Sequence, residues 1–185
     1  CGGDEARTSQ LAIRRRLRAG HNFDLVVNVD LGDSTTQRHV QCYIDENYVL
    51  VVVMAPSCRS VGPPSALNRR INYETRRQAR KADLPHLRFC ARVALRQAQH
   101  AQHGRYWFAE TSYPTYLFDI SEWGKVGSQP TTELRVIDQC RLGRKGPTGL
   151  LVKKPTMIAT NSEDIAQQFT DLRCSGRHEH DKMWG

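Results

Sequence analysis

Two residues with reactive side chains follow apolar segments in a way that is typical of enzymes built on α/β sheets. Cys58 comes shortly after the apolar run VLVVVMA, and Glu110 ends the segment YWFAE. Open α/β sheets carry their reactive groups at the carboxyl ends of strands. There a cysteine thiolate can act as a nucleophile and a glutamate as an acid, a base or a hydrogen-bond partner. The alternatives are a thiol that only packs, which Cys58 taken alone favours, and a glutamate that faces water.

Two further positions suit a nucleotide-containing cofactor. Cys1, Gly2 and Gly3 precede a segment with a helical pattern, and a glycine-rich turn lets a cofactor approach the backbone. Asp30 follows at the end of FDLVVNVDL, which we predict to be a strand. An acidic residue at that place commonly binds ribose hydroxyls. A solvated aspartate at a strand end is the ordinary alternative.

The segment after Cys58 is strongly basic. Residues 59–81 form a predicted loop whose arginines include Arg59, Arg69, Arg70, Arg76 and Arg77. The whole chain has a net charge of +8. Because arginine binds phosphate in a bidentate way, this excess predicts a polyanionic partner, DNA or another nucleic acid. The alternative is a solvated helix face.

A third group lies in the tail, residues 172–185. Cys174, His178 and His180 have the thiol and imidazole side chains that zinc prefers. No fourth ligand is evident near them in the sequence, so a polar tail without metal is the favoured interpretation.

The elements that must position these residues alternate between helices and strands. We predict helices over residues 5–19, 35–47, 83–102 and from 162, and strands over residues 23–31, 49–55, 106–110, 133–140 and 151–160. The helix from Asp83 has that residue as its cap, and the run 49–55 is apolar enough to be buried on both faces. This order predicts a single three-layer α/β domain over residues 1–185, with a mostly parallel sheet and an antiparallel edge strand.

Composition sets the remaining expectations. No apolar run reaches the roughly 20 residues of a membrane span, and the first residues lack the pattern of a signal peptide. The six cysteines are too scattered for a disulfide scaffold. We therefore expect an intracellular protein, nuclear or cytoplasmic, without a membrane. The ends of the chain suggest a segment of a longer polypeptide, and oligomeric state stays open.

In this order the motifs resemble the cytosine-5 DNA methyltransferases, a Rossmann-like family that uses S-adenosylmethionine. Cys1-Gly2-Gly3 is similar to the end of the family's first motif, Ala55-Pro56-Ser57-Cys58 to its Pro-Cys motif, and Phe108-Ala109-Glu110-Thr111 to its Glu-Asn-Val motif. The resemblance implies that residues 1–3, Asp30 and Pro56 border the cofactor. It also implies that Cys58 attacks cytosine carbon 6 while Glu110 stabilises the ring. The resemblance further implies that the basic segment 59–81 contacts DNA and that Lys153 and Lys154 take the place of the family's late arginines.

The chain as a whole is also similar to methyltransferase-like regions of retrotransposon polyproteins. An inactive nucleic-acid-binding or scaffolding module is the alternative, favoured by Ser57 between the proline and the cysteine and by Thr111 in place of asparagine. A weaker interpretation is a two-metal nuclease that uses carboxylates such as Asp30, Asp33, Asp45 and Glu46. If Cys1 follows the first strand of the family, the chain lacks that strand and its sheet has an unpaired edge.

Overall fold

A four-stranded mixed sheet organises the chain in a computed structural model that describes residues 7–63 and 71–181. Its strands, in spatial order, are β1 (Val51–Met54), β2 (Tyr106–Ser112), β5 (Pro155–Thr160) and β3 (Glu133–Asp138). The first two strands are parallel, and β5 is antiparallel to both of its neighbours. Three of the four strands therefore point the same way, which confirms an α/β fold with mostly parallel strands. The predicted position of the antiparallel strand is wrong, because β5 lies inside the sheet and β1 and β3 form its edges.

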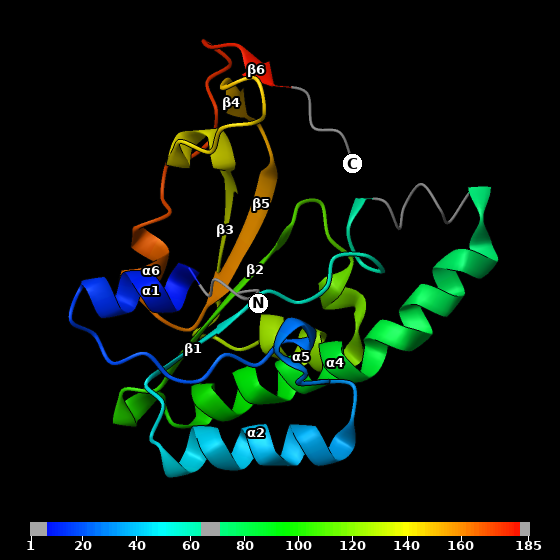
Figure 1. Ribbon diagram of the computed structural model, residues 1–185, viewed down its shortest axis with the longest axis vertical. Helices are drawn as coiled ribbons and strands as arrows, with labels where there is room; N and C mark the ends of the chain where they lie inside the picture. Colours follow the sequence, from blue (N-terminus) through cyan, green and yellow to red (C-terminus); the bar gives the residue numbers. More distant parts are fainter. Residues whose placement is uncertain (1–6, 64–70, 182–185) are drawn as a thin grey trace.

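Helices lie on both sides of this sheet. One side carries α2 (Ser34–Glu46), α4 (Tyr73–Gln99) and α5 (Ser121–Gly127), as Figure 1 shows. The short α6 (Glu163–Gln167) contacts β3 and β5, and Phe169 beyond it packs on Phe108 of β2. The remaining helix, α1 (Arg7–Arg14), has Arg14 in its last turn.

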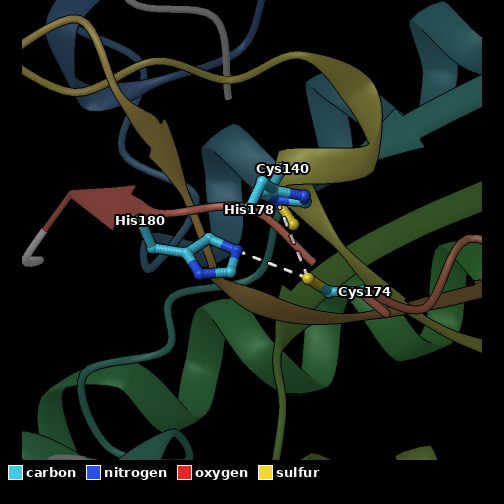
Figure 2. A group of neighbouring side chains, drawn as sticks. All are labelled: Cys140, Cys174, His178 and His180. Atoms are coloured by element: carbon cyan, nitrogen blue, oxygen red, sulfur yellow. Dashed lines mark hydrogen bonds between the residues drawn. The ribbon is translucent and has the colours of Figure 1, made fainter. Parts of the chain in front are cut away.

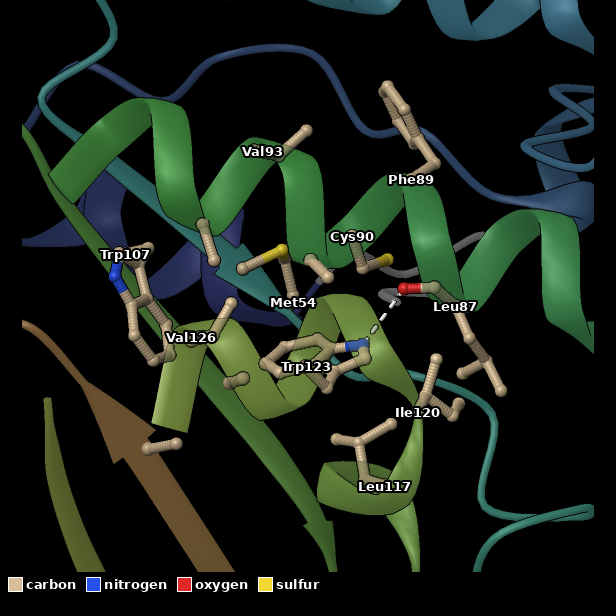
Figure 3. Close-up of a cluster of buried hydrophobic side chains, with 14 of the residues drawn as sticks. Met54, Leu87, Phe89, Cys90, Val93, Trp107, Leu117, Ile120, Trp123 and Val126 are labelled. Carbon is tan, nitrogen blue, oxygen red and sulfur yellow. Dashed lines mark hydrogen bonds between the residues drawn. The ribbon is translucent and has the colours of Figure 1, made fainter. Parts of the chain in front are cut away.

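The core lies between α4, α5 and the sheet. Leu87, Ala91 and Ala94 of α4 are fully buried at the spacing of one helical face. Trp123 of α5 is also fully buried, and its indole N–H donates to the carbonyl of Leu87 at 2.8 Å (Figure 3). Trp107 of β2 meets Trp123 edge to face. This packing fixes α4 across the two parallel strands.

The predicted strand over residues 23–31 is wrong. The segment contains the 3₁₀ turn η1 (Leu25–Val27), which Asp24 caps by accepting the Val26 N–H, and Asn28 closes it with a φ of 60°. The side chain of Asp24 and the left-handed Asn28 both favour a turn over an extended chain. An apolar run alone cannot separate the two outcomes.

The expectation that β1 is buried on both faces is also wrong. Val51 and Val53 are 41% and 46% exposed, whereas Met54 on the other face joins the core. Within the described residues, the edge of β1 that faces away from β2 pairs with no other strand.

The long helix begins ten residues before the predicted Asp83. Asn72 caps α4 by accepting the Thr75 N–H at 3.1 Å, and Glu74 lies in the first turn, where an acidic side chain is favoured. Asp83 and Pro85 both lie inside the helix. The first turns of α4 project away from the sheet, and the helix changes direction along its length (Figure 1), as an internal proline promotes.

The chain after β3 forms a small subregion beyond the sheet. It contains the 3₁₀ turn η4 (Gln139–Leu142) and a parallel pair of two-residue strands, β4 (Leu151–Val152) and β6 (His180–Asp181). Two more 3₁₀ turns, η2 (Ala101–His103) and η3 (Leu117–Asp119), flank β2. Along the described stretches of chain, no helix has the length and apolar character needed to cross a membrane.

Candidate functional site

The parallel pairing of β1 and β2 brings the predicted nucleophile and carboxylate to the same edge of the sheet. Met54 pairs with Ala109, so residue 55 stands level with Glu110, and Cys58 follows three residues later. Cys58 lies beyond Met54, the last residue of β1, whereas Glu110 lies inside β2, which continues to Ser112 instead of stopping at the glutamate. Both residues are therefore near the edge of the sheet where open α/β sheets place their ligands. Neither Cys58 nor Glu110 is fully buried.

A tight turn fixes the backbone around Cys58. The Gly62 N–H donates to the Cys58 carbonyl at 2.6 Å, and the Val61 N–H approaches the same oxygen at 3.3 Å. A Cβ atom on residue 62 would lie 2.7 Å from that carbonyl, so the turn requires glycine. The Val61 carbonyl in turn accepts the Tyr116 N–H at 2.7 Å, which ties the turn to the segment after β2. Cys58 is thus partly accessible on a rigid backbone.

The residues on either side of Cys58 are anchored to α4 by one buried carboxylate. Asp83, whose side chain is 8% exposed, forms an ion pair with Arg59 and accepts the Ser57 hydroxyl at 3.4 Å. The hydrogen bond from Arg59 to Asp83, reinforced by their opposite charges, raises the pKa of Arg59. Asp83 is a site residue that the sequence analysis missed, because it was assigned to a helix cap.

Asp30 lies in a loop that packs on the same part of α4. Gln37 donates through one amide nitrogen to the carbonyls of Leu31 at 2.7 Å and Pro85 at 3.3 Å, which joins this loop to the helix. The Asp30 carboxylate accepts the Gly32 N–H at 2.7 Å. Its predicted place at a strand end is wrong, but it still lies near the turn of α4 that holds Asp83.

The pKa of His86, which lies one helical turn after Asp83, depends on the charges around it. Burial lowers the pKa of this half-buried imidazole, and the negative charges of Asp83, Asp24 and Asp30 oppose that effect without cancelling it. Three carboxylates from the loop and from α4 therefore act on one histidine. Asp24 and Asp30 belong to the loop, and Asp83 is already paired with Arg59.

Glu110 is paired with a lysine from the antiparallel strand. Its Oε1 atom lies 3.6 Å from Nζ of Lys154, is buried and accepts no hydrogen bond from the described residues. Because Trp107 and Ala109 face α4, the alternation of β2 directs Glu110 to the opposite face of the sheet. Lys154 directly precedes β5, and its ammonium group pairs with Glu110. The neighbouring Lys153 is exposed.

The basic segment 59–81 is not a continuous loop. Arg76 and Arg77 belong to the projecting first turns of α4, where Arg77 pairs with Glu74 at 3.4 Å. Arg69 and Arg70 lie outside the described residues, as do Cys1, Gly2 and Gly3. Of the residues predicted to contact DNA in this segment, Arg76 and Arg77 are therefore helical, whereas Arg59 lies before the helix and pairs with Asp83. Pro56, also predicted at the cofactor, is buried between β1 and the Cys58 turn.

The tail residues form a cluster that the sequence did not complete. Cys140 of η4 joins Cys174, His178 and His180, and the four potential ligand atoms all lie within 4.8 Å of one another. Figure 2 shows their side chains pointing toward a common point. Burial and the neighbouring Cys174 thiol raise the pKa of Cys140. Cys140 was missed because it lies far from the tail in the sequence. It belongs to η4, just after β3, and only the folded chain brings this turn to the tail.

The carboxylates of the nuclease interpretation do not gather. Asp33 caps the first turn of α2, and Asp45 lies in its last turn, where it pairs with Arg96 at 2.9 Å and Arg105 at 3.4 Å. Arg96 and Gln41 lower the pKa of Asp45 against the effect of its burial. These carboxylates serve helix α2 and its packing rather than a shared metal site.

Comparison of the chain with family models, with curated proteins and with solved structures finds no match. The functional interpretation therefore depends on the site itself. Two groups of residues are candidates: the sheet edge with Cys58, Glu110 and Lys154, and the Cys/His cluster at the tail.

Proposed function

We propose that this chain is a cytosine-5 DNA methyltransferase-like domain. The observation that supports this most is the placement of Cys58 and Glu110 at the same end of two adjacent parallel strands, with the Lys154 ammonium 3.6 Å from the glutamate. The resemblance of the surrounding motifs gives the nucleophile and the carboxylate these roles. The Rossmann-like form of the fold is part of the proposal, because β1 has exposed valines and an edge that pairs with no strand among the described residues, and both suit a further strand beside it.

In this proposal Cys58 and Glu110 act on one flipped cytosine that lies across the edge of the sheet, because Glu110 points to the face opposite α4 and the Cys58 turn is anchored on the α4 side. The Cys58 thiolate forms a bond to carbon 6, and the electron pair of the 5,6 double bond moves into the ring. Glu110 accepts a hydrogen bond from the exocyclic amine, and the Lys154 charge beside it offsets the negative charge that builds up. The electron pair is used when carbon 5 gains the methyl group. Carbon 5 then loses its proton to water, the electrons of the C–H bond re-form the 5,6 double bond, and the bond between carbon 6 and the Cys58 sulfur breaks to return the thiolate. The base must leave the stack to reach these groups.

The loop and α4 residues near Cys58 fit the predicted cofactor. S-adenosylmethionine carries a positive sulfonium and two ribose hydroxyls, and the loop beside the Cys58 turn carries the carboxylates of Asp24 and Asp30, whose charges reach His86. Asp83 is already paired with Arg59. Asp30 would bind the ribose, and Pro56 would border the cofactor. When bound, the cofactor supplies an electrophilic methyl group. The rest of the chemistry belongs to Cys58, Glu110 and Lys154.

The projecting basic turns of α4 would bind the DNA backbone. Arg76, Arg77, Arg80 and Lys81 lie along this part of the helix, which Figure 1 shows standing away from the sheet. Phosphate contacts of this kind provide affinity without sequence preference.

Methyl transfer from radiolabelled S-adenosylmethionine to cytosine-containing DNA tests the proposal. The full chain should label DNA, Cys58→Ser should abolish labelling, and Cys42→Ser, at an exposed cysteine of α2, should retain it. DNA with 5-fluorocytosine should trap a covalent complex with the wild-type chain, since fluorine cannot leave carbon 5 as a proton does. Equal labelling by wild type and Cys58→Ser would refute the mechanism.

The alternative, a nucleic-acid-binding module without methyl transfer, is favoured by one observation. Ser57 is held by Asp83, so the residue that departs from the Pro-Cys motif is built into the anchor of the turn. Tight, salt-dependent DNA binding by a wild-type chain that neither labels DNA nor forms the trapped complex would establish this alternative.

A further inference from the structure

Four soft and imidazole ligands converge from three separate parts of the chain. Cys140 belongs to η4, Cys174 and His178 to the tail segment, and His180 to β6. The Cys174 sulfur lies 3.3 Å from Nε2 of His180 and 3.8 Å from Nε2 of His178. In a tetrahedral zinc site, a sulfur and a nitrogen ligand stand about 3.6 Å apart. These separations are those of ligands around one ion.

The backbone near Cys174 also suits a thiolate. The Gly176 N–H donates to the Cys174 sulfur at 3.3 Å, and the left-handed φ of 74° at Gly176 turns the chain so that it can. The Cys174 N–H donates to the buried Asp138 carboxylate at 2.8 Å, and Arg173 pairs with the same carboxylate at 3.2 Å. Cys174 is thus positioned by contacts on both sides, as in metal sites with an ordered outer shell.

The segment that carries these ligands lacks an apolar anchor. None of residues 171–181 is buried. Its attachment consists of polar contacts, among them the pairing of β6 with β4 and the Asp181 carboxylate, which accepts the Thr148 N–H at 3.0 Å and its hydroxyl at 2.8 Å. Ordering such a segment costs conformational entropy, and no burial of apolar side chains offsets this cost. A metal bond to each of three residues within it would supply what packing does not.

We propose that Cys140, Cys174, His178 and His180 bind one Zn²⁺ ion in a closed tetrahedral site that holds the tail segment 173–181 against η4 and β4. Two thiolates and two imidazoles select zinc over magnesium or calcium, which prefer oxygen ligands. All four positions are filled by protein side chains, so the site is structural and keeps no place for a substrate. The site is independent of the proposed methyl transfer, since it uses neither Cys58 nor Glu110.

Zinc analysis of the purified full chain tests the proposal directly. Protein prepared under reducing conditions without chelator should retain about one equivalent of zinc per chain. Cys140→Ser and His180→Gln should each lose most of it, while Cys42→Ser, at an exposed cysteine outside the cluster, should match the wild type. Retention of zinc in Cys140→Ser equal to that in the wild type would exclude the fourth ligand and overturn the site.

Two measurements on the unmodified chain cover variants that do not fold. Cobalt added to metal-free protein should give the intense visible bands of tetrahedral sulfur-ligated Co²⁺, and one equivalent of zinc should abolish them. Trypsin should cleave after Arg173 or Arg177 many-fold faster in metal-free protein than in zinc-loaded protein, because the tail is held by the ion. Two results together would overturn the proposal. The first is the absence of the cobalt bands, and the second is that protein isolated with a Cys140–Cys174 disulfide binds no zinc after the disulfide is reduced.

Discussion

Lys154 and Glu110 form an ion pair across two strands of opposite direction, with Nζ 3.6 Å from the buried Oε1. The pair links β2 to the residue just before β5. The sequence predicted this antiparallel strand at the edge of the sheet. The Lys154 ammonium places a positive charge where a ring bound to Glu110 would accumulate negative charge.

Replacing Lys154 should therefore affect the reaction more than binding. We expect Lys154→Gln to lower the rate of DNA methylation by about 100-fold, the effect of removing one electrostatic group from an active site. DNA affinity at fixed salt should change little, since the lysine faces Glu110. The measurement is single-turnover methyl transfer alongside a DNA-binding titration.

The matched control is Lys153→Gln, which removes the same charge from the adjacent exposed position. If both variants lose the same share of activity, the role of Lys154 is general attraction to DNA rather than action at Glu110.

Gly62→Ala should destabilise the fold through the Cys58 turn. The new methyl group would stand 2.7 Å from the Cys58 carbonyl and 3.1 Å from its Cβ, so the backbone would have to move. A loss of about 1–3 kcal/mol in the free energy of unfolding is expected for such overpacking. Urea unfolding followed by tryptophan fluorescence gives the value. Gly20→Ala is the control, because its methyl group meets the Tyr43 hydroxyl at 3.2 Å, the end of a long side chain. Equal losses in both variants would show that the turn is not the cause.

The sequence was most informative where a periodic pattern and its context agreed. The strands predicted over residues 49–55, 106–110 and 133–140 overlap β1, β2 and β3, and the mostly parallel sheet followed from the alternation of strands and helices. It failed at residues 23–31, where a short apolar run reads equally well as a strand or a turn and Asp24 decides the outcome.

The candidate site was only partly predictable for a similar reason. Cys58 and Glu110 were identified from strand ends, which are local signals. Asp83, Lys154 and Cys140 reach their sites through tertiary packing: a helix that starts earlier than its cap signal, a reversed strand inside the sheet, and a turn that meets the tail. Such relationships join residues remote in sequence, and no spacing rule encodes them.

Arg59→Gln should destabilise the protein by leaving the buried Asp83 carboxylate without its charged partner. Asp83 would retain the Ser57 hydroxyl at 3.4 Å, a long hydrogen bond, so we expect a loss of about 1–3 kcal/mol in the free energy of unfolding. Arg59→Lys should recover part of this loss because it keeps the charge. Chemical denaturation of the three proteins measures the series. A Gln variant as stable as the wild type would show that Asp83 is satisfied by water or by its other neighbours.

The stability of the protein should fall as the pH is lowered through the range just below neutrality, because of His86. Burial holds the folded pKa of His86 below its ordinary value of 6.5, despite the charges of Asp83, Asp24 and Asp30. Between the folded pKa and 6.5, the unfolded chain binds a proton at His86 that the folded chain does not, so stability rises with pH in this window.

The slope from one such group cannot exceed about 1.4 kcal/mol per pH unit. His86→Gln should flatten the dependence of the free energy of unfolding on pH between about 7 and 5.5, whereas the change at exposed His103, His103→Gln, should leave it in place. Urea unfolding at several pH values in this range measures both. A slope unchanged in His86→Gln would show that the imidazole gains its proton without cost in the folded protein, and that the three carboxylates fully offset its burial.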